Sequence, residues 1–373
     1  MKRLIPVFTA ALVFITSCGV NKSDTVFEPD NKTGSMQLDY AEQFSVDYYD
    51  DYSVITIDKD KFLLVPENEP VPENTAGLTV IKQPLDNIYD AASSTLDMFD
   101  AAGALDKIKM TSTDANDWSL PNIKQAVESN TISYIGKYRS PDYETLVSQN
   151  CPLAIESTMI YHNPDVKEKI EELGIPVMVE RSSYESHPLG RMEWIKLYGL
   201  LTGNEETADS FFDEKKKLFD SVVSSVKEGE KKTVAFFYVS SNGYVNIRKP
   251  GDYISKMIEL AGGKYLFTAD DLNVDDNELS TMNIQMESFY EKAKEADILI
   301  YNSTIEGELD SLSQLTDKST LFSDFKAVKN GDVWCTGQNM FQQTTGVADM
   351  TADLNKVLSG DDSEPLIFLR RLK

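Results

Sequence analysis

The chain has 373 residues, and its 61 aspartates and glutamates outnumber its 36 lysines and arginines, which gives a net charge of −25. A nucleic-acid-binding protein needs clustered basic side chains to neutralise phosphates, and the sequence has no such cluster, so we exclude that class. Three cysteines and two histidines argue against a disulfide framework and against a histidine-rich zinc or manganese site. An acidic surface instead suits an exported protein held away from anionic lipid headgroups, and the length accommodates about two domains.

Residues 1–18 have the composition of an export signal. The basic start MKR precedes the apolar run LIPVFTAALVFIT, which is shorter than the about 20 residues that a transmembrane helix needs. Cys18 follows small residues and resembles the cysteine of bacterial lipoprotein signals, which is lipidated and becomes the mature N-terminus. The alternative is an ordinary secretory signal with an incidental cysteine. We expect a cell-envelope protein anchored by lipid on the extracytoplasmic face of a membrane.

Residues 19–36 are polar and without periodicity, which predicts a flexible tether. In the stretch FSVDYYDDYSVITI that follows, apolar and polar residues alternate on both sides of Asp50-Asp51. This alternation predicts a β-hairpin within residues 36–65.

From Leu78 onward, predicted strands alternate with predicted helices. LTVIKQP has the composition of a strand, and IYDAASSTLDMFDAAG that of a helix ended by Gly103. In HNPDVKEKIEELGIPVMVE, Asn163 can cap a helix that begins at Pro164, and a buried strand follows Gly174. Units of this kind predict an α/β fold with mainly parallel sheets flanked by helices.

The alternation stops at about residues 188–228, where two helices are expected, the second about 20 residues and about 30 Å long. It resumes with the strands TVAFFYV, ADILIYN and DVWCTG, and a last helix is expected at about Thr345–Leu358. We therefore predict an N-terminal α/β lobe at residues 37–190, a linking helical segment at 191–228 and a C-terminal α/β lobe at 229–373.

Several stretches resemble the substrate-binding lipoproteins of ABC importers for cobalamin, ferric siderophores and haem. These stretches are GKYRSPDYETLVSQNCPLAI, HPLGRMEWIKLYGLLTGNEETAD, ISKMIELAGG and MESFYEKAKEADILI. The resemblance begins at about residue 78 and implies two α/β lobes joined by a rigid long helix, with the ligand in the cleft between them. It also implies a permease dimer with its ATPase subunits as partners, and we expect a monomer. The sequence departs from the family at Cys151-Pro152-Leu153, where Pro-Asp is usual, and the role of the hairpin stays open.

One motif occurs twice, as SPDYETLVSQNCPLAIEST at 140–158 and as IQMESFYEKAKEADILIYNST at 284–304. Each copy starts a helix with a glutamate and ends a strand with Ser-Thr, which we expect to face the cleft. The resemblance implies that the glutamates, Glu144 and Glu287, pair with arginines of the two permease subunits. A carboxylate in the first turn of a helix is stabilised by the helix dipole and is still free to pair. The alternative is that each glutamate only stabilises its own helix.

Ligands of open α/β sheets bind at the loops after the carboxyl ends of strands, so we expect these loops to line the cleft. Their aromatic and methionine side chains suit a large, partly apolar chelate or macrocycle, although ordinary packing is the alternative for any one aromatic. Arg181 and Arg248 could hold carboxylate or catecholate oxygens. His187 could be an axial ligand to haem iron, but a cap of the following helix is the interpretation we favour. The predicted ligand-binding residues are Asn87, Tyr89, Trp118, Thr158, Met159, Tyr161, Arg181, Tyr184, His187, Ser241, Tyr244, Arg248, Asn302, Met340 and Phe341.

The resulting hypothesis is a high-affinity substrate-binding lipoprotein that captures a ferric chelate of siderophore type, without a cofactor or a resident metal of its own. Cobalamin and haem are the alternative ligands. A lipid-anchored hydrolase is a further alternative, but the sequence has neither a G-x-S-x-G nor an H-E-x-x-H motif. A glycan-binding lipoprotein would show all-β patterning, which is confined here to residues 44–65.

Overall fold

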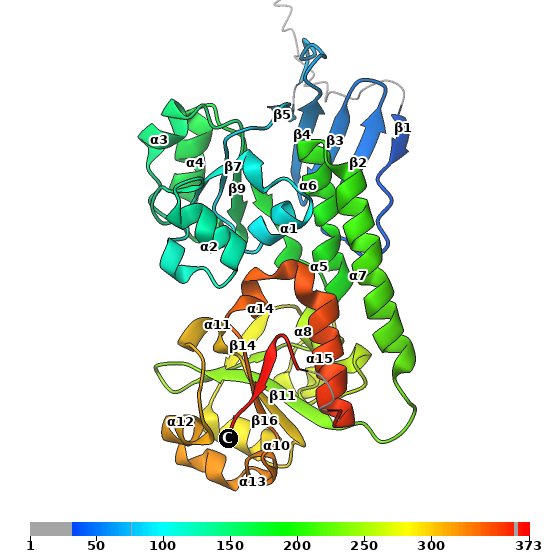
Figure 1. Ribbon diagram of the computed structural model, residues 1–373, viewed down its shortest axis with the longest axis vertical. Helices are drawn as coiled ribbons and strands as arrows, with labels where there is room; N and C mark the ends of the chain where they lie inside the picture. The colour runs from blue at the N-terminus through cyan, green and yellow to red at the C-terminus, as the bar shows by residue number, and fades with distance from the viewer. Residues whose placement is uncertain (1–31, 76, 362–364) are drawn as a thin grey trace, which may run out of the picture.

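The computed structural model describes residues 32–75, 77–361 and 365–373 (Figure 1). The predicted leader with Cys18, and the tether up to residue 31, lie outside the described residues. The end of the predicted tether is wrong, because Lys32–Ser35 form strand β1, which pairs antiparallel with β2 (Phe44–Tyr49). No helix in these ranges is both long enough and apolar enough to cross a membrane.

A five-stranded sheet precedes the two lobes, in the order β1-β2-β3-β4-β5. The strands after β1 are β2 (Phe44–Tyr49), β3 (Ser53–Ile57), β4 (Asp60–Val65) and β5 (Thr79–Lys82). The predicted hairpin is β2–β3, and its alternation buries Phe44 and Val46 in the main core. LTVIKQP contains β5, as predicted, but β5 pairs parallel with β4 and does not join the sheet of the first lobe.

The first lobe is a parallel sheet in the order β10-β9-β6-β7-β8. Its strands are β6 (Ile88–Asp90), β7 (Ile108–Thr111), β8 (Ser133–Tyr134), β9 (Ala154–Ser157) and β10 (Val177–Glu180). Its helices are α1 (Leu96–Ala101), α2 (Pro121–Glu128), α3 (Tyr143–Ser148) and α4 (Pro164–Glu172). The single helix expected from IYDAASSTLDMFDAAG is wrong in its first part, because Ile88–Asp90 are paired between β7 and β9.

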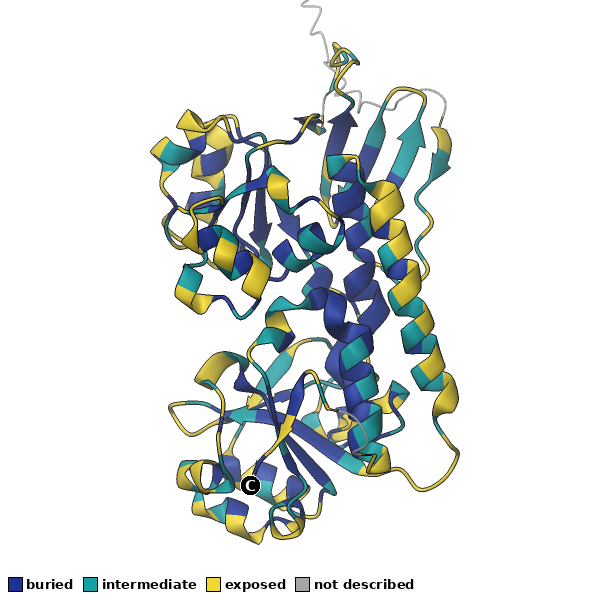
Figure 2. Ribbon diagram, viewed as in Figure 1, coloured by how far each residue is buried: buried dark blue, intermediate teal, exposed yellow. Residues whose placement is uncertain are grey.

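Three helices follow the first lobe: α5 (Pro188–Glu193), α6 (Ile195–Thr202) and α7 (Glu205–Ser225). Helix α5 is buried along its whole length and α6 almost so, whereas α7 is buried only on its inner side (Figure 2). α7 packs tightly on α6 because Gly199 has no side chain: a Cβ there would lie 2.7 Å from the Cβ of Ala208. α7 runs along one side of the molecule and also packs on α15 (Val347–Ser359) of the second lobe (Figure 1). Its role as a rigid link stays a prediction.

The second lobe has a seven-stranded sheet in the order β14-β12-β11-β15-β16-β17, with β13 beside β11. Its strands are β11 (Thr233–Val239), β12 (Val245–Arg248), β13 (Lys264–Tyr265), β14 (Thr281–Ile284), β15 (Ile298–Tyr301), β16 (Val333–Thr336) and β17 (Leu369–Arg371). β11, β13, β15 and β16 are parallel, whereas β12 pairs antiparallel with both β11 and β14, and β17 pairs antiparallel with β16. The α/β fold class is therefore confirmed, with antiparallel strands at both edges of this sheet.

Helices flank the second sheet and pack their apolar sides on it. They are α8 (Tyr253–Leu260), α9 (Ala269–Leu272), α10 (Met286–Ala293), α11 (Ser303–Glu306), α12 (Leu312–Lys318), α13 (Lys326–Asn330), α14 (Asn339–Gln342) and α15 (Val347–Ser359). The rings of Phe237, Phe289 and Phe322 pack against one another in this lobe's core. α15 is the predicted last helix.

Candidate ligand-binding cleft

A cleft of about 580 Å³ lies between the first and the second lobe. Its first wall consists of the segments at the carboxyl ends of four parallel strands, because Ala91 follows β6, Ser112 follows β7, Ser157 ends β9 and Glu180 ends β10. Arg248 and other residues of the second lobe form the opposite wall. A cavity of about 290 Å³ in the second lobe shares Arg248 and Phe341 with the cleft. Ligands of open α/β sheets occupy this kind of position.

Part of the predicted ligand-binding set lies in these cavities. The residues that line the cleft are Thr158, Met159, Tyr184, Arg248 and Phe341, and Asn302 lines the cavity beside it. Thr158 is in the Ser-Thr end of the first repeated motif, and Asn302 directly precedes that of the second. The repeated motif therefore ends at the cavities in both lobes.

The other predicted residues of the first lobe lie elsewhere. Tyr89 is 0% exposed in the core beneath α3 and α4, because alternation along β6 turns it inward. Asn87 precedes β6 and lies at the amino end of the strand, where its amide donates to the carbonyl of Gln149 at 3.1 Å. Trp118 is buried, and its indole N–H donates to the carbonyl of Thr113 at 3.3 Å. Tyr161 is exposed outside the cleft lining.

Arg181 also lies outside the cleft lining. Its guanidinium is 3.5 Å from the Asp58 carboxylate, in the turn between β3 and β4, and lies over the ring of Tyr184. Arg181 therefore ties the N-terminal sheet to the first lobe, and the prediction that it lines the cleft is wrong.

His187 caps a helix, as favoured from the sequence. Its Nδ1 accepts the backbone N–H of Leu189 at 3.1 Å, at the start of α5. The ring stacks on Tyr40 with centroids 4.5 Å apart, and burial lowers the pKa of His187 to about 4, so the imidazole is neutral. The capping interpretation is confirmed, and His187 lies outside the cleft lining.

In the second lobe, three predicted residues lie outside both cavities. Ser241 and Tyr244 are in the tight turn from β11 into antiparallel β12, where the Ser241 N–H donates to Glu306 at 3.1 Å. Met340 is buried beside the cleft. The expectation that a loop after a parallel strand reaches the cleft fails here, because β12 turns straight back.

Sequence reasoning missed several polar residues that line the cleft. They are Lys137, Tyr138, His162, Glu180, Arg191, Asp252 and Tyr253. The available signal for Arg191 was a lone arginine inside the largely apolar run PLGRMEW, and that for Asp252 was an aspartate directly before a predicted helix. Asp252 caps α8 by accepting the N–H of Ile254 at 2.9 Å.

A sequence profile of the periplasmic binding protein family matches residues 91–340. The chain belongs to this family. It is 26% identical over 348 residues to an uncharacterized lipoprotein of Methanocaldococcus jannaschii. The match covers 86% of this chain and 81% of that lipoprotein. Its fold is similar to that of a possible iron-binding periplasmic protein from Staphylococcus epidermidis (TM-score 0.55, 18% identity, 73% of this chain and 98% of the other). It is also similar to the haem-binding protein HutB of Vibrio cholerae (TM-score 0.57, 16% identity, 72% and 98%).

Members of the periplasmic binding protein family are extracytoplasmic and bind small solutes for ABC importers, and they are not enzymes. The hydrolase alternative is therefore set aside. The α/β fold likewise sets aside the all-β architecture expected of a glycan-binding lipoprotein. Among the described residues, no group of three or more His, Cys, Asp and Glu side chains is placed to hold a metal ion.

On the first wall of this binding protein, buried carboxylates hold the loops in place. Glu180 accepts the N–H of Ser182 at 2.8 Å and the hydroxyl of Ser94 at 3.3 Å. Asp90 accepts the N–H of Ala92 at 2.9 Å and the hydroxyl of Thr95. Burial raises the pKa of Asp90 well above its ordinary value. The loop between β6 and α1, which lines the cleft, is thus fixed by hydrogen bonds at both of its ends.

On the second wall, Arg248 and Asp252 form a buried pair with 3.5 Å between guanidinium and carboxylate. Burial raises the pKa of Asp252, while the positive charges of Arg248 and Arg191 oppose that rise. The hydroxyl of Tyr265 hydrogen-bonds both the N–H and the carbonyl of Arg248, at 3.0 and 2.6 Å. The end of β12 therefore holds the Arg248 backbone in a fixed position beside the cleft.

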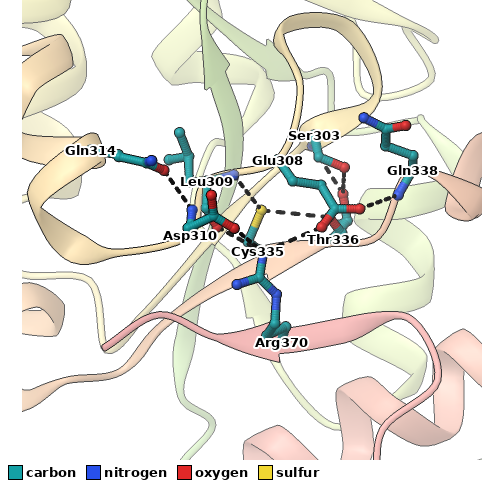
Figure 3. A network of polar contacts seen from close by, with 9 residues as sticks. All are labelled: Ser303, Glu308, Leu309, Asp310, Gln314, Cys335, Thr336, Gln338 and Arg370. Atoms are coloured by element: carbon teal, nitrogen blue, oxygen red, sulfur yellow. Dashed lines mark hydrogen bonds and ion pairs between the residues drawn. The ribbon is translucent and has the colours of Figure 1, made fainter.

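The position of Phe341 depends on a polar network at the end of β16 (Figure 3). Glu308 accepts the N–H of Gln338 at 3.1 Å and the guanidinium of Arg370 at 3.2 Å. Thr336 Oγ1 accepts the N–H of Ser303 at 3.0 Å. These bonds fix the chain just before α14, the helix that carries Phe341 into the cleft.

The lobes are joined by direct hydrogen bonds next to the cleft. The side chain of Gln342 accepts the N–H of Ser119 at 2.8 Å and donates to the carbonyl of Asp117 at 2.7 Å. The hydroxyl of Thr344 donates to the carbonyl of Ser94 at 2.8 Å. The segment from α14 to α15 therefore holds the two walls together.

Glu144 and Glu287 lie in the first turns of α3 and α10, as predicted. Both are exposed, and neither forms an ion pair within the described part of the chain. Neither helix lies at the seam between the lobes (Figure 1). The two carboxylates are therefore free to pair with a partner, and their docking role stays a prediction.

Proposed function

We propose that this protein is the lipid-anchored solute-binding component of an ABC importer, and that it captures a ferric chelate of siderophore type. The observation that carries the proposal is the charge of the cleft. Arg191, Arg248 and Lys137 line it and balance the carboxylates of Asp117, Glu180 and Asp252, in a protein whose net charge is −25. The cleft is therefore less acidic than the protein as a whole, and an anionic ligand meets less repulsion there than at the rest of the surface.

The lining also suits a bulky ligand with apolar and oxygen-rich parts. Tyr138, Tyr184, Tyr253 and Phe341 supply aromatic surface, and a series of serine and threonine hydroxyls supplies hydrogen bonds. Cavities of about 580 and 290 Å³ that share two residues fall in the size range of sites for small molecules and cofactors. Haem is the alternative that a specific feature favours, because His162 and Tyr138 in the lining could ligate its iron. Cobalamin is a further alternative.

The proposal includes the membrane and the permease. Lipidation at Cys18 would hold the protein at the membrane surface, and the relative from Methanocaldococcus jannaschii is named a lipoprotein. Glu144 and Glu287 would orient the protein on a permease dimer with its ATPase subunits, because paired complementary charges fix orientation and speed association.

Tryptophan fluorescence tests the ligand assignment. Trp118 lies directly behind Thr113, a residue of the cleft wall, so its emission reports on occupancy. The purified protein is titrated with a panel of ferric siderophores, with haem and with cobalamin. We expect saturable quenching by a ferric chelate. If only haem or cobalamin gives saturable quenching, that compound is the ligand and the role as solute-binding protein stands. If none of the compounds binds, the proposal is overturned.

A further inference from the structure

Arg191 is a buried cation without a polar partner. Its side chain, from α5, is 2% exposed and lines the cleft. Its guanidinium lies over the rings of Tyr253, 4.7 Å from the centroid, and Phe341, 5.5 Å from the centroid. Within the described part of the chain, the guanidinium forms no ion pair and no hydrogen bond. Buried charges are usually paired, so this arrangement needs an explanation.

The neighbours of Arg191 in the run PLGRMEW all have structural partners. Glu193 accepts three backbone N–H groups from residues 39–41. Trp194 donates its indole N–H to Glu185 at 2.8 Å. Gly190 permits close passage of the N-terminal segment, because a Cβ there would lie 2.7 Å from the carbonyl oxygen of Tyr40. Arg191 is therefore the charged residue of this run that the fold itself does not use.

The buried carboxylates that line the cleft already have other partners. Asp252 is paired with Arg248 at 3.5 Å. Glu180 accepts the N–H of Ser182 and the hydroxyl of Ser94. The rings of Tyr253 and Phe341 restrain the guanidinium of Arg191, while its N–H donors remain without acceptors. A guanidinium presents its N–H donors as a planar fork. This fork matches the two oxygens of a carboxylate, which it can bind through two parallel hydrogen bonds.

We propose that Arg191 is the anchor for a carboxylate group of the ligand, and that Tyr253 and Phe341 hold the anchor in place. The anchor is assembled from α5, α8 and α14, so it exists only where the helical segment after the first lobe meets the second lobe. The protein then selects carboxylate-bearing chelates over neutral chelates of similar size. This inference rests on the proposed function, because it requires that the ligand enters this cleft.

Two iron chelates separate the anchor from the function. Ferric citrate is anionic and carries carboxylates, whereas ferrichrome is neutral and lacks them. For Arg191→Met we expect the affinity for ferric citrate to fall at least about tenfold, since bonds between charged groups are lost. The affinity for ferrichrome, if it binds, should stay within about twofold. Arg191→Lys, which keeps the charge but not the fork, should be intermediate.

Two controls exclude a structural explanation. Arg371→Met removes an arginine that also lies over an aromatic ring, that of Trp334 at 5.5 Å, but away from the cleft, and it should leave both affinities unchanged. Arg191→Met should melt at the same or a higher temperature than the wild type, because it removes a buried charge without a hydrogen-bond partner. A lower melting temperature with equal loss of both chelates would assign Arg191 to the fold instead.

The outcomes with the wild-type protein are also distinct. If the wild type binds ferrichrome but not ferric citrate, the anchor is overturned and the proposed function stands. The same holds if the Arg191→Met variant still binds ferric citrate at full affinity. Failure of the wild type to bind either chelate, with no binding in the siderophore panel, overturns the proposed function and the anchor with it.

Discussion

The carboxylate of Glu193 accepts the backbone N–H of Tyr40 at 2.8 Å, across 153 positions of the chain. It also accepts the N–H groups of Asp39 and Ala41, at 3.0 and 2.9 Å. Glu185 does the same for the next two residues, Glu42 and Gln43. Two buried glutamates thus clamp residues 39–43 onto the helical segment next to the cleft. The N-terminal sheet, whose role the sequence left open, is an integral part of the folded body.

Glu193→Gln should destabilise the protein by about 2–4 kcal/mol, because a buried amide cannot accept from all three backbone N–H groups at once. Chemical denaturation followed by circular dichroism measures the change. Glu206→Gln, at an exposed position in the first turn of α7, is the matched control and should change stability by less than about 0.5 kcal/mol. Equal effects of the two substitutions would show that the clamp contributes nothing.

Glu156 makes the stability of the first lobe depend on pH. The side chain is 0% exposed, neither carboxylate oxygen has a hydrogen-bond partner, and burial raises its pKa from 4.5 to about 9. The folded state therefore keeps the proton that the unfolded state loses above pH 4.5. The contribution of Glu156 to stability falls as pH rises from 4.5 to about 9, by up to about 1.4 kcal/mol per pH unit.

Replacing this carboxyl group tests the sign of that effect. Glu156→Gln cannot ionise, so the stability difference between the variant and the wild type should grow in favour of the variant from pH 5 to pH 8. Denaturation at several pH values gives the slope. Glu168→Gln, exposed on α4, should show no such slope. A difference for Glu156→Gln that is independent of pH would mean that this carboxyl is ionised in the folded protein.

The double substitution Glu144→Ala with Glu287→Ala should abolish uptake of the ligand by cells while leaving ligand affinity in solution unchanged. The reason is that both carboxylates are exposed on helices that do not line the cleft. Glu168→Ala with Glu291→Ala removes one exposed carboxylate from each lobe at other positions and should preserve uptake. Loss of affinity in the first variant would place its residues in the binding site, and normal uptake would end the docking assignment.

The opening between free and bound states should be small. Gln342 and Thr344 already hydrogen-bond the second lobe to the first, and α7 packs on both α6 and α15. A long helix that packs on both sides limits hinge motion. Small-angle scattering should therefore give nearly equal radii of gyration with and without the ligand, whereas a large compaction on binding would contradict the rigid-link prediction.

Local sequence signals predicted most of the fold and only part of the cleft. Pro164 at the start of α4 and the first-turn glutamates of α3 and α10 were predictable because helix ends depend on neighbouring residues. β6 was assigned to a helix, because a strand of three residues is defined by its partners β7 and β9. Such pairing is a property of the tertiary structure.

The arginines show where the site prediction stopped. Arg181 and Arg191 both follow β10, but Arg181 turns to Asp58 of the N-terminal sheet and Arg191 turns to the cleft. The direction of each side chain depends on how α5 packs against the second lobe and on where the N-terminal sheet lies. No spacing rule carries that information. The sequence therefore predicted arginines in the cleft, but of the two that it proposed, Arg181 and Arg248, it placed Arg181 wrongly.

The most direct test of the account is the position of iron in the protein. Crystals are grown with the ferric chelate that the fluorescence titration selects, and anomalous scattering is measured at the iron absorption edge. The account predicts one strong iron peak in the cleft between Thr158 of the first lobe and Arg248 of the second. An iron peak outside this cleft, or a cleft occupied by a ligand that contains no iron, would contradict the account.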